Sequence, residues 1–80
     1  MKKIVFTSAA TRQWAKLSAD IRKRIDAKLT IYATNGSGDV KRLKGRGDCR
    51  LRVGDWRVIF IEENTEIIIV AVGNRRKIYD

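Results

Sequence analysis

The sequence predicts an α+β domain with the element order β-α-α-β-β-β, in which an N-terminal helical hairpin packs on one face of an antiparallel four-stranded sheet. Three observations lead to this fold class. Apolar residues recur at helical spacing between positions 8 and 35. Three apolar segments between positions 49 and 72 are separated by short polar turns. A further short apolar segment, over residues 2–6, opens the chain.

The composition limits the chemistry that this chain can perform. Its 80 residues predict one domain over residues 1–80, and its single cysteine excludes an internal disulfide. The absence of histidine removes most zinc sites and the common nucleophile–histidine pairs, so we expect no metal and no cofactor. A net charge of +9 favours a polyanionic partner such as nucleic acid. A basic protein without such a partner is the alternative.

The sequence has no signal that directs it to a membrane. No segment approaches the roughly 20 apolar residues that a transmembrane helix needs. Lys2 and Lys3 are followed by only three large apolar residues, whereas a secretory signal needs an apolar run of about 7–15. We therefore expect a cytoplasmic protein without a membrane partner.

The first half of the chain is expected to form one strand followed by two helices. Residues 2–6 are expected to form the first strand, and the hydroxyls of Thr7 and Ser8 can cap the helix that follows. Its apolar stripe consists of Ala10, Trp14 and Leu17. A second helix begins after Ser18 and ends at Asn35 and Gly36. Its apolar stripe consists of Ile21, Ile25, Leu29 and Tyr32.

The second half begins with a dense group of cations and ends in a sheet. The cations that follow the loop at 36–39 are Lys41, Arg42, Lys44 and Arg46. Three strands are then expected over residues 49–53, 56–61 and 66–72. The turn residues Gly54 and Asp55 connect the first two of them, so the three form an antiparallel meander. Residues 67–70 are apolar on both faces, which indicates a central strand.

The meander is expected to gather cations on one face. Alternation along a strand places Arg50 and Arg52 on the side opposite Leu51 and Val53. The patch away from the helices should contain Arg50, Arg52, Arg57, Arg75 and Tyr79. Arginine binds phosphate bidentately, and a tyrosine can hold a ribose 2′-hydroxyl or stack on a base, so this patch indicates a phosphodiester site. Arginines that only aid solubility, an ordinary basic tail and a structural tyrosine are the alternatives.

In the order and spacing of these segments, nearly the whole chain resembles the RelE/ParE superfamily of bacterial toxins from toxin–antitoxin pairs. Besides the strand and helical hairpin, the resemblance is carried by residues 41–45 (KRLKG), 50–60 (RLRVGDWRVIF) and 72–79 (VGNRRKIY). In this superfamily, RelE-like members cut mRNA in the ribosomal A site, and ParE-like members poison DNA gyrase. The resemblance implies a cognate antitoxin, the ribosome and mRNA as partners, with operator DNA reached through the antitoxin complex.

The resemblance to the RNase branch also implies roles for single residues. By position, its basic set and C-terminal tyrosine correspond to Arg50, Arg52, Arg57, Arg75 and Tyr79. It implies attack by the ribose 2′-hydroxyl on the neighbouring phosphate, which leaves a 2′,3′-cyclic end and a free 5′-hydroxyl. Arg57 and Arg75 would stabilise the transition state, and Tyr79 would orient the nucleophile and its base. Further RNA-binding residues would be Lys41, Arg42, Lys44, Arg46, Arg76 and Lys77.

Two departures from the RNase branch leave proton transfer open. RelE itself has lysines at the positions matched by Arg50 and Arg52, and arginine cannot lose its proton in a protein, so both can act only electrostatically. Many relatives carry histidine where this chain has Asn74. The proton carrier is then Tyr79, an acid such as Asp80, or a group of the ribosome. A ParE-like gyrase poison and a non-enzymatic nucleic-acid-binding module are the alternative functions.

Overall fold

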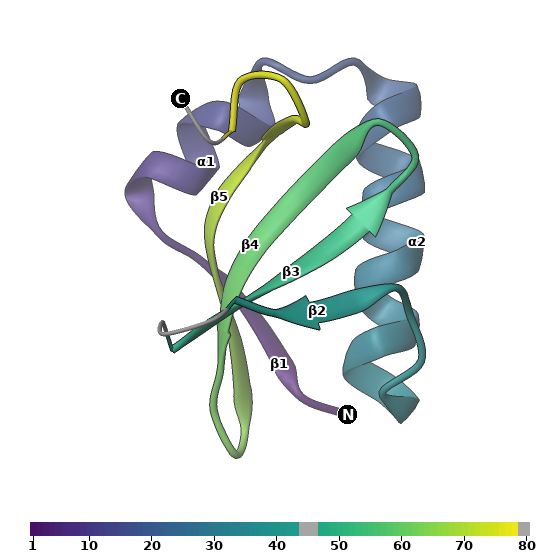
Figure 1. Ribbon diagram of the computed structural model, residues 1–80, viewed down its shortest axis with the longest axis vertical. Coiled ribbons are helices and arrows are strands. Elements are labelled where there is room, and N and C mark those ends of the chain that lie inside the picture. The colour runs from purple at the N-terminus through teal and green to yellow at the C-terminus, as the bar shows by residue number, and fades with distance from the viewer. Residues whose placement is uncertain (44–46, 79–80) are drawn as a thin grey trace.

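The computed structural model describes residues 1–43 and 47–78, so Lys44, Gly45, Arg46, Tyr79 and Asp80 lie outside the described residues. In chain order its elements are β1 (Lys3–Phe6), α1 (Ser8–Ala15), α2 (Ala19–Asn35), β2 (Val40–Arg42), β3 (Asp48–Val53), β4 (Trp56–Glu62) and β5 (Glu66–Asn74). Figure 1 shows the two helices on one side of a twisted sheet. The mixed α+β class is therefore confirmed.

The sheet differs from the expected four antiparallel strands. It has five strands in the order β1-β5-β4-β3-β2, and β1 runs parallel to β5, with Lys3 opposite Glu66 and Phe6 opposite Ile69. The helical hairpin carries the chain across one face to the far edge of the sheet, and the meander brings it back (Figure 1). The last strand of the meander therefore arrives beside β1 in the same direction. Strand β5 lies between β1 and β4, which is the central position that its apolar residues on both faces predict.

The fifth strand, β2, was not among the expected elements, and its Lys41 and Arg42 were predicted only as cations that follow the loop at 36–39. It has only three residues, and two of them are cations, so it carries too short a pattern to indicate a strand. Its pairing to β3 places Lys41 opposite Arg50 and Arg42 opposite Cys49. A short, charged edge strand also resists pairing with another sheet.

Both helices begin where the sequence predicts, and α2 also ends there. Helix α1 ends at Ala15, so Leu17 of its expected apolar stripe lies beyond the helix. The Thr7 hydroxyl accepts a hydrogen bond from the backbone N–H of Ala10 at 3.2 Å, and the Ser18 hydroxyl accepts one from Ile21 at 3.3 Å. Gly36 ends α2 with a φ of 77°, in the left-handed region that favours glycine. Neither helix is long and apolar enough to cross a membrane, as judged over residues 1–43 and 47–78.

The core lies between the helices and the sheet, and it decides which strand face is left for a partner. Phe60 is fully buried, with its ring centroid 5.4 Å from that of Tyr32. Trp14 packs on Phe6 at 5.2 Å, as expected for a core side chain. The strand residues of this cluster are Cys49, Leu51, Val53, Val58, Phe60, Ile67, Ile69 and Val72. Alternation along β3 and β4 therefore turns their arginines to the face away from the helices.

Candidate nucleic-acid interface

The turn between β3 and β4 brings two of the predicted arginines together. Arg52 and Arg57 are direct cross-strand partners on the face away from the helices, next to the turn at Gly54. Like charges directly opposite each other repel, so each guanidinium needs a partner of its own. Arg57 Nη1 donates to the carbonyl oxygens of Gly54 and Trp56 at 2.8 and 2.9 Å. Arg52 Nε lies 3.9 Å from a carboxylate oxygen of Asp39.

Arg75 joins this pair through Asp55. Its backbone N–H donates to the Asp55 carbonyl at 2.8 Å, and its Nε lies 3.8 Å from Asp55 Oδ1. The backbone bond fixes the start of the C-terminal turn against the β3–β4 turn. The side-chain pair is exposed, 52% for Arg75 and 73% for Asp55, so it contributes less than about 1 kcal/mol and can be exchanged for another anion.

The other predicted cations are distributed over both faces of the sheet. Arg50 lies opposite Ile59 of β4 and Lys41 of β2, on the same face as Arg52 but further from the turn. Arg42, the next residue after Lys41, faces the helix side, beside Cys49. Burial raises the pKa of Cys49, and the charge of Arg42 lowers it by a smaller amount. Strand alternation therefore separates Lys41 from Arg42.

The turn after β5 is shaped by Asn74. Its side-chain oxygen accepts from the backbone N–H of Arg76 at 3.0 Å, and its carbonyl accepts from Lys77 and Ile78, each at 3.0 Å. Arg76 and Lys77 are exposed on this turn. Asn74 thus supports the turn that follows Arg75. The predicted site residues Tyr79, Lys44 and Arg46 lie outside the described residues.

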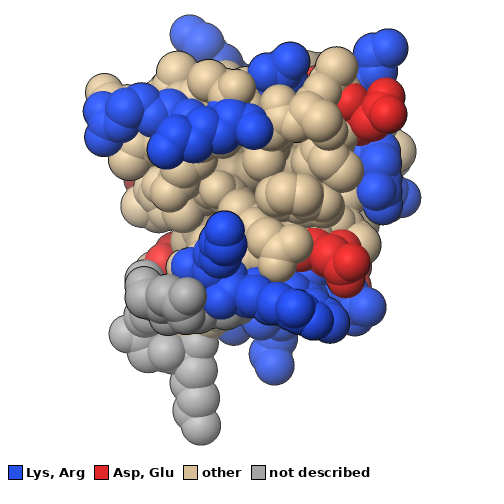
Figure 2. Space-filling view, turned by 90° about the horizontal axis from the view of Figure 1, so that it is seen from above, with Lys and Arg blue, Asp and Glu red and all other residues tan. Residues whose placement is uncertain are grey.

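A groove of about 590 Å³ runs beside this turn, between α1 and β5. Leu17, Trp56 and Ile78 supply its apolar wall, and Lys16 and Lys77 stand at its sides. Figure 2 shows an uncharged strip between two groups of Lys and Arg side chains. Lys77 therefore places a positive charge beside the α1–β5 groove, whereas Arg52 lies on the sheet face away from the helices.

A second polar cluster occupies the other end of β4 and supports the fold. The Tyr32 hydroxyl donates to Glu62 Oε1 at 2.6 Å, and Lys2 Nζ donates to Glu62 Oε2 at 2.7 Å. These two hydrogen bonds hold the pKa of the Glu62 carboxyl below its usual range. Burial, together with the bond to Glu62, raises the pKa of Tyr32 to about 12. Burial also raises the pKa of the Cys49 thiol.

The arrangement around the β3–β4 turn can bind and neutralise a phosphate, but its arginines cannot carry a proton. Within the described part of the chain, no three Asp, Glu or Cys side chains are grouped to hold a metal ion. Sequence reasoning did not identify Asp39 and Asp55 as partners of Arg52 and Arg75. Asp55 was assigned to a turn and Asp39 to a loop, and only the folded register shows which arginine each one meets.

Comparisons with known proteins agree with this fold. The family model described as the ParE toxin of type II toxin–antitoxin system, parDE, matches residues 4–79. The mRNA interferase toxin RelE of Escherichia coli (strain K12) is 26% identical over 77 residues, which cover 90% of this chain and 81% of that protein. A chain of the RelB–RelE antitoxin–toxin complex from Methanococcus jannaschii matches with a TM-score of 0.79, 27% identity and 95% coverage of each chain. The isolated E. coli RelE toxin matches with a TM-score of 0.78 at 19% identity over 92% of this chain and 84% of its own, which is a likeness of fold alone.

Proposed function

The chain belongs to the family of ParE toxins of type II toxin–antitoxin systems, and we propose that it inhibits translation by cutting mRNA on the ribosome. The 26% identity to the mRNA interferase toxin RelE supports the RNase branch over the gyrase branch. The observation that carries the proposal is the cluster of Arg52, Arg57 and Arg75 around one turn. Three guanidiniums at one edge of a sheet suit a phosphodiester group.

The proposed reaction is an internal transfer at phosphorus. The ribose 2′-oxygen bonds to the adjacent phosphorus, the bond from phosphorus to the 5′-oxygen breaks, and a 2′,3′-cyclic phosphate and a 5′-hydroxyl result. Arg57 and Arg75 neutralise the charge that develops on the phosphoryl oxygens, and Arg50 and Arg52 hold the flanking backbone. Tyr79 orients the 2′-hydroxyl. One proton leaves the 2′-oxygen and one is delivered to the departing 5′-oxygen. The carriers are Tyr79, Asp80 or ribosomal groups, because arginine stays protonated.

The exposed partners of the arginines make this site ready for a phosphate. Asp39 and Asp55 stand 3.9 and 3.8 Å from the Nε atoms of Arg52 and Arg75, in pairs that are open to solvent. A phosphate that carries two acceptor oxygens can replace either carboxylate with little loss, because exposed pairs are weak. The aspartates therefore keep the arginines extended without blocking them.

We further propose that a cognate antitoxin neutralises this toxin by covering the cationic face. The related RelB–RelE complex pairs a toxin with its antitoxin in one assembly. A net charge of +9 favours a partner segment with acidic residues, laid down as a helix or an extended strand. Operator DNA would be reached only through that complex. Co-expression with the product of a small neighbouring open reading frame should restore growth and yield a stable complex on purification.

The test of the enzymatic proposal is to map mRNA ends on translating ribosomes after a pulse of expression. We expect cuts within A-site codons for the wild type and for Arg12→Ala, a control that removes one exposed cation of α1. The double variant Arg75→Ala/Tyr79→Phe should lose cleavage by at least about 10²-fold and no longer arrest growth. Undiminished cleavage by that variant would show that the site is assigned wrongly.

The match to a ParE family model favours one second candidate, a poison of DNA gyrase. It predicts chromosomal DNA damage after expression, with mRNA ends left unchanged. A purely nucleic-acid-binding module predicts neither cuts nor DNA damage, with salt-dependent RNA binding as its only activity. The same pulse experiment, read by RNA-end mapping and by a DNA-damage reporter, separates the three.

A further inference from the structure

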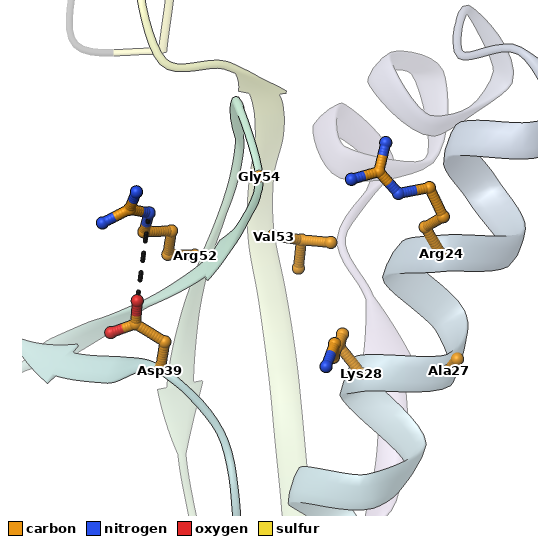
Figure 3. A pocket seen from close by; sticks show the side chains of 7 residues that line it. All are labelled: Arg24, Ala27, Lys28, Asp39, Arg52, Val53 and Gly54. Carbon is orange, nitrogen blue, oxygen red and sulfur yellow. Dashed lines mark ion pairs between the residues drawn. The ribbon is translucent and has the colours of Figure 1, made fainter.

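A second cationic pocket lies between α2 and the β3–β4 hairpin, and two of its cations, Arg24 and Lys28, are outside the set of site residues predicted from the sequence (Figure 3). It has a volume of about 560 Å³ and is open to solvent. Arg24 and Lys28 extend from α2 towards the hairpin, and Arg52 borders the pocket from β3, with its side chain turned to Asp39. The two α2 residues are four positions apart, which places them on one face of the helix. Only the fold brings these two residues and Arg52 to the border of one pocket.

Gly54 makes room for one of these guanidiniums. A Cβ atom at this position would stand 2.8 Å from Arg24 Nη2, and the φ of 61° disfavours a side chain as well. The Arg24 guanidinium therefore lies against the bare backbone of the turn. The carbonyl of the same residue holds Arg57 at 2.8 Å. One turn thus carries a cation from α2 on one side and a cation of the proposed cleavage site on the other.

The charges of the pocket are unbalanced. Three cations share it with one carboxylate, Asp39, which already lies 3.9 Å from Arg52 Nε in a pair more than half exposed. Within residues 1–43 and 47–78, Arg24 and Lys28 form no ion pair. Cations gathered around an open pocket repel one another and attract an anion of matching size. A phosphate with several acceptor oxygens can bridge a guanidinium and an ammonium.

We propose that this pocket binds a phosphate of an RNA backbone and so extends the RNA path from the sheet face around the β3–β4 turn onto α2. The inference rests on the proposed function for the identity of the nucleic acid. Arg52 lines the pocket and also belongs to the proposed site, so the two cationic surfaces are continuous. An acidic protein segment fits less well, because the apolar lining is only Ala27 and the buried Val53, whereas protein interfaces depend on apolar or aromatic anchors.

The probe that separates binding from cleavage is a 2′-O-methyl RNA oligonucleotide, which lacks the nucleophilic hydroxyl. Its dissociation constant is measured over a range of salt concentrations for the wild type, Arg24→Ala/Lys28→Ala and the matched control Arg22→Ala/Lys23→Ala. The control removes the same charge from the same helix outside the pocket. Loss of the one phosphate that the two side chains neutralise together should reduce the slope of log K against log salt by about 0.7, and the control should leave the slope near that of the wild type.

Vacant ribosomes without message form a second arm, because the phosphate can belong to the message or to ribosomal RNA. A reduced slope with the oligonucleotide assigns the pocket to the message strand, and a reduction with ribosomes alone assigns it to ribosomal RNA. The charge-conserving variant Arg24→Lys/Lys28→Arg should keep most of the slope in either arm. If the double alanine variant unfolds, the single change Lys28→Ala, at an exposed position, should still lower the slope, by up to about 0.7.

Two results would overturn the proposal. One is an equal change in slope for the pocket variant and its matched control, which would mean a general effect of net charge. The other is a salt slope that the pocket variant leaves unchanged in both RNA arms. If that variant weakens only the binding of polyglutamate, a probe for an acidic protein segment, the pocket does not bind RNA. A wild-type protein that never cuts ribosome-bound mRNA would contradict the proposed function instead, because the binding slopes are measured without cleavage.

Discussion

Removing one hydroxyl tests whether the Tyr32–Glu62 pair holds the end of the sheet to α2. The change Tyr32→Phe deletes the donor of the 2.6 Å bond to Glu62 and keeps the ring that packs on Phe60 at 5.4 Å. A hydrogen bond to a charged acceptor contributes about 1.5–3 kcal/mol. Because the Glu62 side chain is 27% exposed, we expect a loss near the lower end, about 1.5 kcal/mol at neutral pH. For a domain of this size that lowers Tm by about 6–12 °C.

The same variant should change the pH dependence of the free energy of unfolding in two windows. The pKa of Tyr32 is raised in the folded state from 10.0 to about 12, so the wild type loses stability as the pH rises between these values. The full shift corresponds to about 2.7 kcal/mol, and solvent screening of this half-buried group reduces the expected loss to about half. The lowered pKa of Glu62 contributes stability above about pH 4.3, and this is lost as the pH falls through the folded value. Tyr32→Phe should abolish the alkaline loss and weaken the acid one.

The assay is urea unfolding followed by the fluorescence of Trp14 and Trp56, at neutral, acid and alkaline pH. The control Thr34→Ala removes a hydroxyl of the same helix that bonds only to the Thr30 carbonyl, and it should change stability by no more than about 0.5 kcal/mol. A double-mutant cycle with Glu62→Gln should give a coupling of about 1 kcal/mol or more. A variant as stable as the wild type, with the same alkaline loss, would refute this account of the cluster.

Four further changes test the core, the turns and the proposed site. Phe60→Ala, at a fully buried position, should cost about 3–5 kcal/mol and leave much of the protein unfolded by circular dichroism. Gly36→Ala and Gly54→Ala should each cost about 1–2 kcal/mol in denaturant melts, because both have positive φ values, 77° and 61°. Asp55→Asn should weaken the hold on Arg75 and slow mRNA cleavage by less than about 10-fold with Tm nearly unchanged, whereas a larger Tm loss would make Asp55 a structural residue only.

Local features of this chain were predictable because short-range rules decide them. The caps at Thr7, Ser18 and Gly36 depend only on a hydroxyl or a glycine next to an apolar period. The opposite faces of Arg57 and Val58 follow from the two-residue period of a strand. These rules placed the helices, the β3–β4 turn and the arginine face correctly.

Features that depend on distant segments were not predictable in the same way. The direction of β1 is decided by where the meander ends, and β2 exists only because β3 offers it an edge. The partners of Arg52 and Arg75 are aspartates that a local reading assigns to loops. Arg24 stands 28 positions before Arg52 and meets the same pocket only in the folded chain.

The parallel contact between β1 and β5 has a consequence for how the chain folds during synthesis. Residues 3–6 leave the ribosome well before their partners, residues 66–69, so β1 must wait for β5. Such a long sequence separation slows folding, because the loop between the two strands must close before their pairing stabilises it. Arg75 follows directly after β5, so the guanidinium cluster and the last pairing of the sheet depend on the same late segment. The nascent protein therefore acquires its complete sheet and its proposed phosphate-binding group together, only after β5 and Arg75 have been made.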